Sequence, residues 1–347
     1  MAKNKLDQKS KFTKDEDLTK PNQARVFYFL TKRHLLVFFK NWSQILFTLM
    51  VPLAILFIYG LFLRPMEVAS INNALEKMLS SDALKDQTLM AKVYGIADTW
   101  MFSGVLAVSC FTVSLNTCTI MVRDKEKEIS RDFNSSPISQ SIVTASYFSF
   151  NAIITFFINL IVYCVCLIYL SFSGADLPSV LDGFAIVGLI LISTICASLI
   201  TFFICSFIKS ESTMASLVAI TSASVGFLIG AYLPPNMVPK AISTITTFVP
   251  GTYSCCLIRS YFMNQPMLDL FNYASSKYPE MGENIVNTLY SQFDFSLSFF
   301  NIKISVQTMS LVLLSFIGIF IIFDIFLTPN KIIMYQKYFL NQKNDRK

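Results

Sequence analysis

Long apolar runs with few or no charged residues are the feature that most limits what this chain can fold into. An α-helix needs about 20 predominantly apolar residues to cross a ~30 Å hydrocarbon core. Runs of that kind cover residues 44–63, 99–122, 142–172, 180–207, 213–232 and 306–327. Charged residues make up only 14% of the chain and hydrophobic residues 54%, whereas soluble domains carry roughly 25% charge. The sequence therefore predicts an all-α integral membrane protein with six transmembrane helices.

The two ends of the chain are polar and basic. Residues 1–22 are rich in lysine and have no apolar stretch near the start, which predicts a cytosolic tail and not a cleaved signal peptide. Residues 328–347 predict a second cytosolic tail after a six-span domain of residues 44–327. Residues 23–43 mix apolar with basic side chains and include Trp42. That pattern is typical of an amphipathic helix in the inner headgroup region, in contact with membrane lipids.

Lysine and arginine are unevenly distributed between the connecting segments. The N-terminal region holds ten of them and the C-terminal tail five, whereas residues 64–98 hold four, outweighed by five acids. Because cytosolic segments carry the excess of basic residues, both termini and residues 123–141 are predicted to be cytosolic. Residues 64–98 then form an outer loop, where the spacing of Ile71, Leu75, Met78 and Leu79 predicts a short amphipathic helix. Basic residues gather at the chain ends and not on one folded face, so no nucleic-acid partner is expected.

A segment of mixed charge, RDKEKEISRDFNSSPISQS, joins the second and third apolar runs at residues 123–141; it is called the charged segment below. Charges three and four residues apart can pair along a helix, predicted from about Asp124 to Asn134. Ser136 and Pro137 then form a helix stop and restart. The charged segment fits a rigid docking surface for a cytosolic partner, and it fits a solvated turn between two spans equally well.

Polar residues recur every four positions along the third apolar run. They are Tyr147, Asn151, Thr155, Asn159 and Tyr163. Because polar side chains are costly in lipid, this polar stripe should face protein or a translocation path, and the spacing does not choose between the two. In the fifth run Ser222, Gly226 and Gly230 lie four residues apart. Such small residues permit close helix packing, either within the chain or along a seam between two protomers.

Prolines interrupt the apolar sequence between the fifth and sixth runs. Pro234 and Pro235 end the fifth run, and Pro250 with Gly251 divides the stretch that follows. Proline breaks a helix, so residues 233–301 predict two short helices that dip in from the outer side and then a polar outer segment. Non-helical backbone at that depth needs protein or water around it. Arg259 lies in this re-entrant region.

The sequence contains no motif for catalysis. No glycine is followed by the Lys-Ser or Lys-Thr pair of a phosphate-binding loop. His34 is the single histidine, and the cysteines lack metal-site spacing, so we predict neither catalytic residues nor a metal site. An intramembrane enzyme such as an acyltransferase is therefore disfavoured. The energy for any transport would come from another protein.

These features occur in the order found in a known family. An interfacial N-terminal helix, six spans, a charged inner segment and Pro-broken helices before the last span resemble the type-2 ABC exporter permeases. The charged segment matches the family's run of mixed charge, from Lys125 to Glu128, followed by Ser136 and Pro137. The later residues similar to the family's outer re-entrant motif are GAYLP at 230–234, Pro239, FVPGTY at 248–253 and LIR at 257–259. The resemblance covers roughly Val26 to Leu327.

The resemblance implies half of the membrane portion of an ATP-driven exporter in a cell membrane, which we expect to be bacterial. The permease would pair with itself or a sister permease and with two copies of a separate ABC ATPase. That ATPase would bind ATP and Mg²⁺, so no cofactor is expected in this chain. The residues implied to dock it are Arg123, Glu126, Glu128, Arg131, Asp132 and Pro137. An amphipathic drug, antibiotic, peptide or lipid would move outward, as in multidrug or antibiotic resistance.

Two departures from the family pattern affect the choice of substrate. Ile129 and Ser130 stand where the family often has a Gly-Thr pair, and residues 64–98 are longer than the outer loop of the polysaccharide-exporting branch. The longer loop favours the drug, peptide or lipid branches. A membrane anchor or sensor subunit that docks a cytosolic partner without transport is the alternative. The Pro-broken helices argue against it, because a plain anchor has no need of them.

Overall fold

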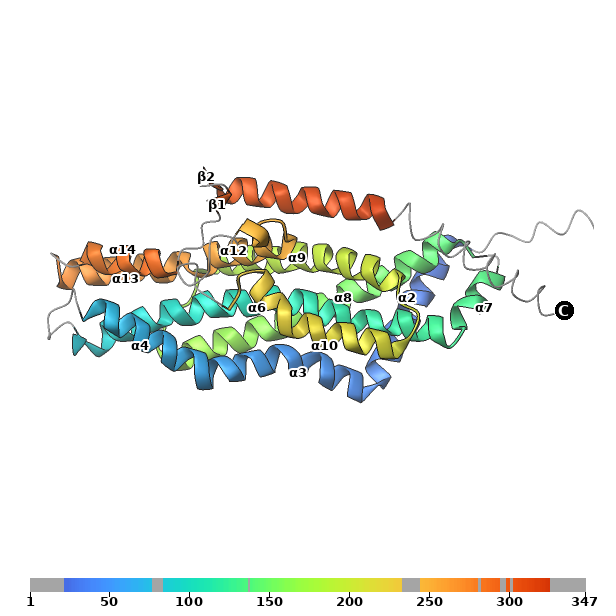
Figure 1. The fold of residues 1–347 in the computed structure, drawn as a ribbon, viewed down its shortest axis with the longest axis horizontal. Helices are drawn as coiled ribbons and strands as arrows, with labels where there is room; N and C mark the ends of the chain where they lie inside the picture. The colour runs from blue at the N-terminus through green and yellow to red at the C-terminus, as the bar shows by residue number, and fades with distance from the viewer. Residues whose placement is uncertain are drawn as a thin grey trace, which may run out of the picture.

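The computed structural model describes residues 22–76, 84–136, 138–232, 244–279, 282–293, 298–299 and 302–324. Six of its helices are long and apolar enough to cross a membrane, judged by length and composition. They run along the long axis of an elongated molecule (Figure 1). The chain is therefore the all-α, multi-pass membrane protein that its sequence predicts.

The first membrane helix consists of three consecutive pieces. They are α3 (Trp42–Ile58), the π-helical turn η1 (Tyr59–Leu63) and α4 (Arg64–Leu75). The other five are α6 (Gln87–Glu126), α8 (Gln140–Ser173), α9 (Val180–Ser206), α10 (Glu211–Leu228) and a last membrane helix (Val306–Asp324). Ser179 and Ser210 cap α9 and α10 by accepting the backbone N–H groups of Asp182 and Thr213, so each helix begins directly after a short polar turn.

Helix α6 is the axis of the bundle. Its 40 residues give a length of about 60 Å, twice the ~30 Å of a hydrocarbon core, so it extends beyond the bilayer. Helices α3, α8, α9 and α10 all pack against it. Side chains are buried along almost its whole length, including Trp100, Phe102 and Leu106. A movement of one end of α6 would therefore displace most of the other helices that pack on it.

Each end of the bundle carries its own short helices. One end, called the α7 end here, carries α7 (Ile129–Ser135). The opposite end, called the α14 end, carries α13 (Asn264–Lys277) and α14 (Gly282–Gln292), which pack together beside α4 and the first turns of α6. A pair of two-residue antiparallel strands, β1 (Ser298–Phe299) and β2 (Ile302–Lys303), precedes the last membrane helix.

Residues 64–98, predicted as an outer loop with one short helix, are more helical than expected. Helix α4 continues the first membrane helix without a break, and α6 begins at Gln87, well before the predicted start at Thr99. Asp86 fixes this start because its carboxylate accepts the first backbone N–H groups of the helix. Of the four residues on which the short amphipathic helix was predicted, Ile71 and Leu75 lie in α4, whereas Met78 and Leu79 lie outside the described residues.

Several charged residues in this stretch have a partner inside the protein, which the sequence alone did not reveal. The carboxylate of Asp98 lies 2.8 Å from the Arg64 guanidinium and accepts a 2.8 Å hydrogen bond from Tyr59 Oη. Lys92 Nζ lies 2.6 Å from a carboxylate oxygen of Asp176, in the turn between α8 and α9. Paired in this way, charged side chains are compatible with a buried helix face.

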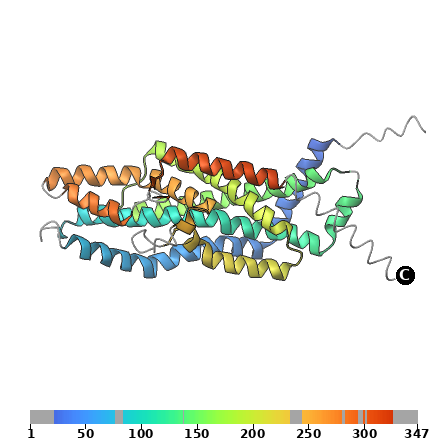
Figure 2. The ribbon, with the colours of Figure 1, turned by 45° about the horizontal axis from the view of Figure 1, so that its top comes forward.

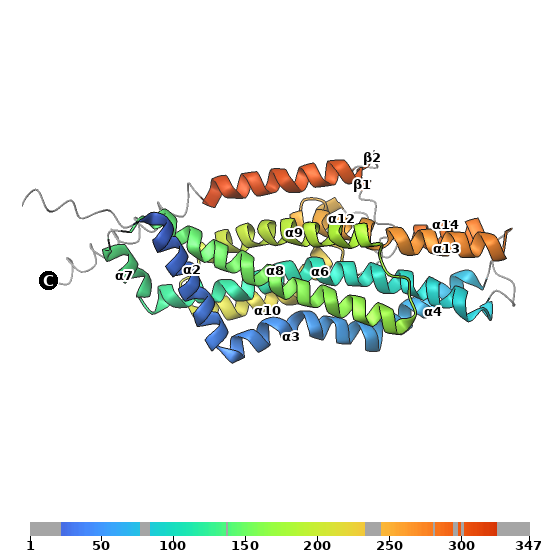
Figure 3. The same cartoon turned by 180° about the vertical axis from the view of Figure 1, so that it is seen from behind.

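Helix α2 (Gln23–Lys40) lies across the bundle at the α7 end, whereas the membrane helices run lengthwise (Figures 2 and 3). It packs mainly on α8 and buries Leu30, His34 and Phe38. Its bounds agree with the amphipathic helix expected at residues 23–43. Its direction, across the ends of the spans, is the one expected of a helix that lies along a membrane surface.

The charged segment is not the single helix predicted from about Asp124 to Asn134. Helix α6 ends at Glu126, and Glu128 adopts the left-handed conformation with φ of 62° before α7 begins. A left-handed residue ends a helix by letting backbone N–H groups turn back to its last carbonyls, and here the backbone N of Glu128 donates to the carbonyl of Lys125 at 3.2 Å. The charged segment is therefore a helix end, a sharp turn and a second short helix.

The stretch divided by Pro250 and Gly251 contains a helix of half the usual length. Helix α12 (Pro250–Phe262) starts at Pro250, in the first turn, where the missing N–H of proline costs nothing. Almost every side chain of α12 is buried, and the helix packs on α6 and α9. Pro234 and Pro235 lie outside the described residues.

Candidate functional site

The charged segment begins on the last turn of α6, where two of its side chains contact the start of α10. Arg123 Nη2 lies 2.7 Å from Glu211 Oε1. Glu126 Oε2 accepts a hydrogen bond of 2.8 Å from the backbone N of the same Glu211. A carboxylate at a helix N-terminus satisfies an N–H group that has no partner within the helix, and it interacts favourably with the helix dipole. The end of α6 is thus fastened to the first residue of α10.

Lys125 fastens the same turn to α9. Its Nζ donates to the backbone oxygens of Cys205 and Ser206, at 3.1 and 3.2 Å. Both carbonyls belong to the last turn of α9, where a cation is favoured by the helix dipole. Arg123, Lys125 and Glu126 therefore hold the charged segment to both sides of the turn between α9 and α10.

Asp124 points the opposite way, into the protein. It is only 3% exposed and forms an ion pair with Arg33 of α2, at 2.6 Å from Nη1 and 3.3 Å from Nη2. Tyr147 Oη of α8 donates to the same carboxylate at 2.6 Å. Three helices, α2, α6 and α8, meet at this one group, which is called the Asp124 clamp below (Arg33, Asp124 and Tyr147).

His34 completes the packing around the Asp124 clamp. Its ring is fully buried, stacks on Tyr147 with ring centroids 4.0 Å apart, and lies 3.3 Å from Ser146 Oγ. Burial and the neighbouring Arg33 charge lower the pKa of His34 to about 4, despite the opposing effect of Asp124. The ring is neutral at pH 7, and the clamp has one charge of each sign.

The predicted docking residues divide into two groups. Arg123 is half-buried in its contact with α10, whereas Glu126, Glu128 and Asp132 are exposed at the tip of the segment. Arg131 lies in α7, and only its backbone is described. Pro137 lies outside the described residues. The exposed part of the charged segment is therefore rich in carboxylates.

Sequence reasoning missed Arg33, Asp124, Lys125 and Glu211 as members of the site. One signal was available for Asp124. It follows the buried Val113, Thr117 and Ile120 of α6 at helical spacing, which places it on an inward face. Nothing in the sequence identified the partner that it would meet there.

The polar stripe of the third run faces protein. Asn151 is its centre: Oδ1 accepts from Ser114 Oγ at 2.9 Å on α6 and from Ser198 Oγ at 3.1 Å on α9, while Nδ2 donates to the Ser114 carbonyl at 3.0 Å. Further along, Ser109 of α6 donates to Asn159. These bonds hold α6, α8 and α9 together.

The remaining members of the polar stripe are also buried. Thr155 Oγ1 lies 3.4 Å from Thr117 Oγ1 of α6, and the ring of Tyr163 lies edge-on to Phe262 of α12, with centroids 5.9 Å apart. Tyr147, at the α7 end of the stripe, belongs to the Asp124 clamp. The polar stripe was expected to face either protein or a translocation path. All of its described contacts are with other helices of this chain.

The small residues of the fifth run have separate roles. A Cβ at Gly226 would collide with the ring of Tyr232, so glycine makes room for that ring. Gly230 ends the helical stretch with φ of 67°, a conformation that glycine adopts without strain. Ser222 is partly buried. The opposite face of α10 exposes small residues, namely Ala215, Ala219 and Ala223.

Arg259 on α12 joins three parts of the chain. It donates to the carbonyls of Gly230 and Ala231, both at 3.0 Å, to Ser103 Oγ at 3.2 Å and to the Trp100 carbonyl at 3.3 Å. Its guanidinium also stacks on the Trp100 ring, 3.9 Å from the centroid. The side chain is 3% exposed. Arg259 therefore fastens α12 to α6 and to the turn after α10.

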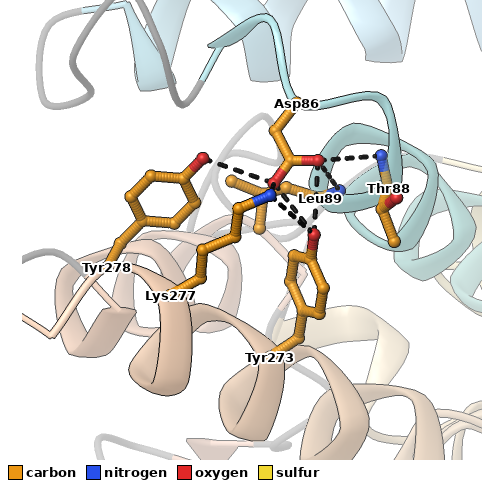
Figure 4. A network of polar contacts seen from close by, with 6 residues as sticks. All are labelled: Asp86, Thr88, Leu89, Tyr273, Lys277 and Tyr278. Atoms are coloured by element: carbon orange, nitrogen blue, oxygen red, sulfur yellow. Dashed lines mark hydrogen bonds and ion pairs between the residues drawn. The ribbon is translucent and has the colours of Figure 1, made fainter.

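A polar network at the α14 end ties the start of α6 to α13 (Figure 4). Asp86, which caps α6, lies 2.8 Å from Lys277 Nζ and accepts a hydrogen bond of 3.0 Å from Tyr273 Oη. The Lys277 hydrogen bond is the main cause that lowers the pKa of Asp86 to about 2, against a smaller effect of burial. Asp86 therefore stays ionised throughout the physiological pH range.

Comparison with known proteins gives one family. The family model described as ABC-2 type transporter matches residues 25–263, more than half of the chain. This range runs from the start of α2 to the end of α12, and it includes the charged segment and the Arg259 contacts. No curated protein matches the chain. The chain belongs to the ABC-2 type transporter family and is the multi-pass membrane permease of an ABC transporter.

Proposed function

We propose that this permease is powered by a separate ABC ATPase that docks on the charged segment, and that it exports an amphipathic substrate such as a drug, antibiotic, peptide or lipid. The observation that carries this proposal is the position of the charged segment. It lies at the end of α6, the longest and most buried of the membrane helices, and exposes carboxylates at its tip. An ATPase groove lined with basic residues would complement it.

A rigid connection is what allows docking to do work on the membrane helices. Arg123, Lys125 and Glu126 fasten the charged segment to α9 and α10, and the Asp124 clamp fastens it to α8. Movement of the docked ATPases would therefore shift the ends of four membrane helices together. Rigid-body movement of that kind is a common way to open one face of a transporter.

The other parts of the proposal follow from the family and from the charge distribution. Two permeases, identical or sister chains, would assemble with two ATPase subunits in a cell membrane, which we expect to be bacterial. The ATPases would bind ATP and Mg²⁺. Both tails, residues 1–22 and 328–347, would lie in the cytosol together with the α7 end, and the α14 end would lie outside.

Co-purification tests the proposal directly. The permease and the ATPase encoded beside it would be co-expressed and purified in nanodiscs, with Glu128→Lys/Asp132→Lys as the docking variant. Glu283→Lys, an exposed reversal on α14 at the other end of the molecule, is the matched control. We expect the wild type and the control to co-elute with the ATPase and hydrolyse ATP, and the docking variant to lose the ATPase. Unchanged co-elution of the docking variant would contradict docking on the charged segment.

A membrane anchor or sensor subunit remains the second candidate function. The buried helix α12 argues against it, because its fastening to α6 and to the turn after α10 through Arg259 serves no purpose in a plain anchor. Failure of every neighbouring ATPase to bind the wild type, with a histidine kinase bound in its place, would support the sensor.

A further inference from the structure

The charged side chains of helix α2 are distributed unevenly between its inward and outward faces. The helix carries four cations and no acid. Arg33 turns inward and is neutralised by Asp124. The other three, Arg25, Lys32 and Lys40, are exposed. All the charges on the outward face of α2 are therefore positive, and the one inward cation, Arg33, binds the rest of the protein.

Large apolar side chains lie among the exposed cations. Tyr28 is 59% exposed, Phe29 53% and Phe39 60%, and Leu36 lies between them at 49%. Such side chains would be unfavourable on a water-facing helix that carries no partner. Aromatic rings alternating with Lys and Arg along one face suit the boundary between headgroups and acyl chains, where the rings insert and the cations meet phosphates.

The direction of α2 agrees with this environment. The helix lies at the α7 end, at a steep angle to the lengthwise membrane helices, and packs on α8 and α3 (Figure 3). Its last residue, Lys40, is separated from the start of the first membrane helix at Trp42 only by the cap residue Asn41. The outward face of α2 is therefore held at the level where that membrane helix begins.

The inward face of α2 connects this surface to the charged segment. Arg33 contacts Asp124 in the last turn of α6, two residues before that helix ends, and its guanidinium also lies over the ring of Phe133 of α7, 5.4 Å from the centroid. One side chain thus reaches both helices of the charged segment. A shift of α2 would be passed to the charged segment without any other element in between.

We propose that α2 binds anionic phospholipid headgroups through Arg25, Lys32 and Lys40, and that the Asp124 clamp transmits this binding to the charged segment. The permease would then present the charged segment in an ordered form only where anionic lipid surrounds it. This inference deepens the proposed docking function, but its first test below needs no ATPase.

Hydrogen exchange of the permease alone is the first test. The chain is placed in nanodiscs of phosphatidylcholine or of an equal mixture of phosphatidylcholine and phosphatidylglycerol, and deuterium uptake of residues 123–136 is measured. Attraction of one Lys or Arg to an anionic surface corresponds to about a fivefold change in an equilibrium. We expect exchange of residues 123–136 in the wild type to be several-fold slower in the anionic discs. Equal exchange in the two lipids would overturn the proposal.

Two variants separate lipid binding from transmission. Arg25→Gln/Lys32→Gln/Lys40→Gln removes the lipid-binding cations, and Lys85→Gln, an exposed lysine at the other end of the molecule, is its control. Tyr147→Phe/Arg33→Gln weakens the clamp while leaving the exposed cations in place. The first variant should lose the lipid effect on exchange and the control should keep it. A lipid effect that persists in the first variant would contradict binding through these cations.

The clamp variant needs a separate readout of lipid contact. Quenching of Trp42 by brominated anionic lipid, in a Trp100→Phe background, reports how closely the end of α2 approaches the bilayer. We expect the clamp variant to retain wild-type quenching and to lose the lipid effect on exchange of residues 123–136. If the clamp variant keeps both the quenching and the lipid effect on exchange, the clamp does not couple lipid binding to the charged segment. If the clamp variant loses both the quenching and the lipid effect on exchange, the clamp only holds α2 in place. This result would also contradict the proposed coupling.

The last test measures ATP hydrolysis by the complex of permease and ATPase in the two lipids. If the complex forms, ATP hydrolysis by the wild type should be several-fold faster in the anionic discs, and the cation variant should not respond. If no ATPase binds, the proposed docking function fails. The exchange and quenching results still decide whether α2 binds anionic lipid and whether this binding orders the charged segment. The two failures are therefore distinguishable.

Discussion

Replacing Arg259 should separate α12 from the rest of the bundle. The guanidinium makes four hydrogen bonds to groups on α6 and on the turn after α10, and it stacks on the Trp100 ring. Interhelical hydrogen bonds in membrane proteins contribute about 0.6 kcal/mol each, and a desolvated cation–π contact about 2 kcal/mol. We therefore expect Arg259→Met to lower the free energy of unfolding by about 4 kcal/mol. Arg259→Lys keeps the charge but not the planar stack, so it should lose about half of that.

The fluorescence of Trp100 reports on this contact directly. The chain has two tryptophans, so a Trp42→Phe background leaves Trp100 as the only source of tryptophan emission. Unfolding in a denaturing detergent, followed by Trp100 emission, gives the loss of stability and the change of the ring's surroundings in one experiment. Arg25→Met is the matched control, because Arg25 lies on the exposed face of α2, 5.7 Å from the ring of Phe29. A loss below about 1 kcal/mol for Arg259→Met, with unchanged emission, would refute the fastening role.

Three further changes test other contacts by the same unfolding assay. Gly226→Ala should destabilise by about 1–3 kcal/mol because its Cβ would meet the Tyr232 ring; adding Tyr232→Ala should recover part of the loss, and no recovery would place the cause elsewhere. Asn151→Leu should cost about 2 kcal/mol through its three bonds to α6 and α9, and a neutral result would contradict that role. The pKa of His34 is about 4 in the folded protein, so stability should be full above about pH 6.5 and fall by up to about 3 kcal/mol as the pH drops towards 4. His34→Asn should abolish this dependence, and a persistent one would assign it to other groups.

The apolar runs were enough to predict the membrane helices and most of their bounds. The fourth run was predicted to begin at Val180, where α9 begins, and the structure shows Ser179 as the cap at this position. The start of α6 was missed by a dozen residues. Charges such as Lys92 and Asp98 look like loop residues in a sequence window, and only their partners in space make them compatible with a helix.

For the candidate site too, features within one helix could be predicted from the sequence, whereas contacts between helices could not. Local sequence identified the charged segment and the polar stripe, because both are periodic or compositional features of a single helix. It could not reveal that Asp124 faces inward to Arg33, 91 residues earlier, or that Glu126 meets the first residue of α10. Contacts of that kind depend on how helices pack, which no residue pattern within one helix specifies.

The position of the docked ATPase tests the central claim most directly. A photo-crosslinking amino acid would replace Lys127, which is exposed at the turn of the charged segment, or Glu283 at the α14 end as the control. Illumination of the assembled transporter should join the ATPase to the permease from position 127 and not from position 283. Cross-links from position 283 alone, or none from position 127 in a complex that hydrolyses ATP, would contradict docking on the charged segment.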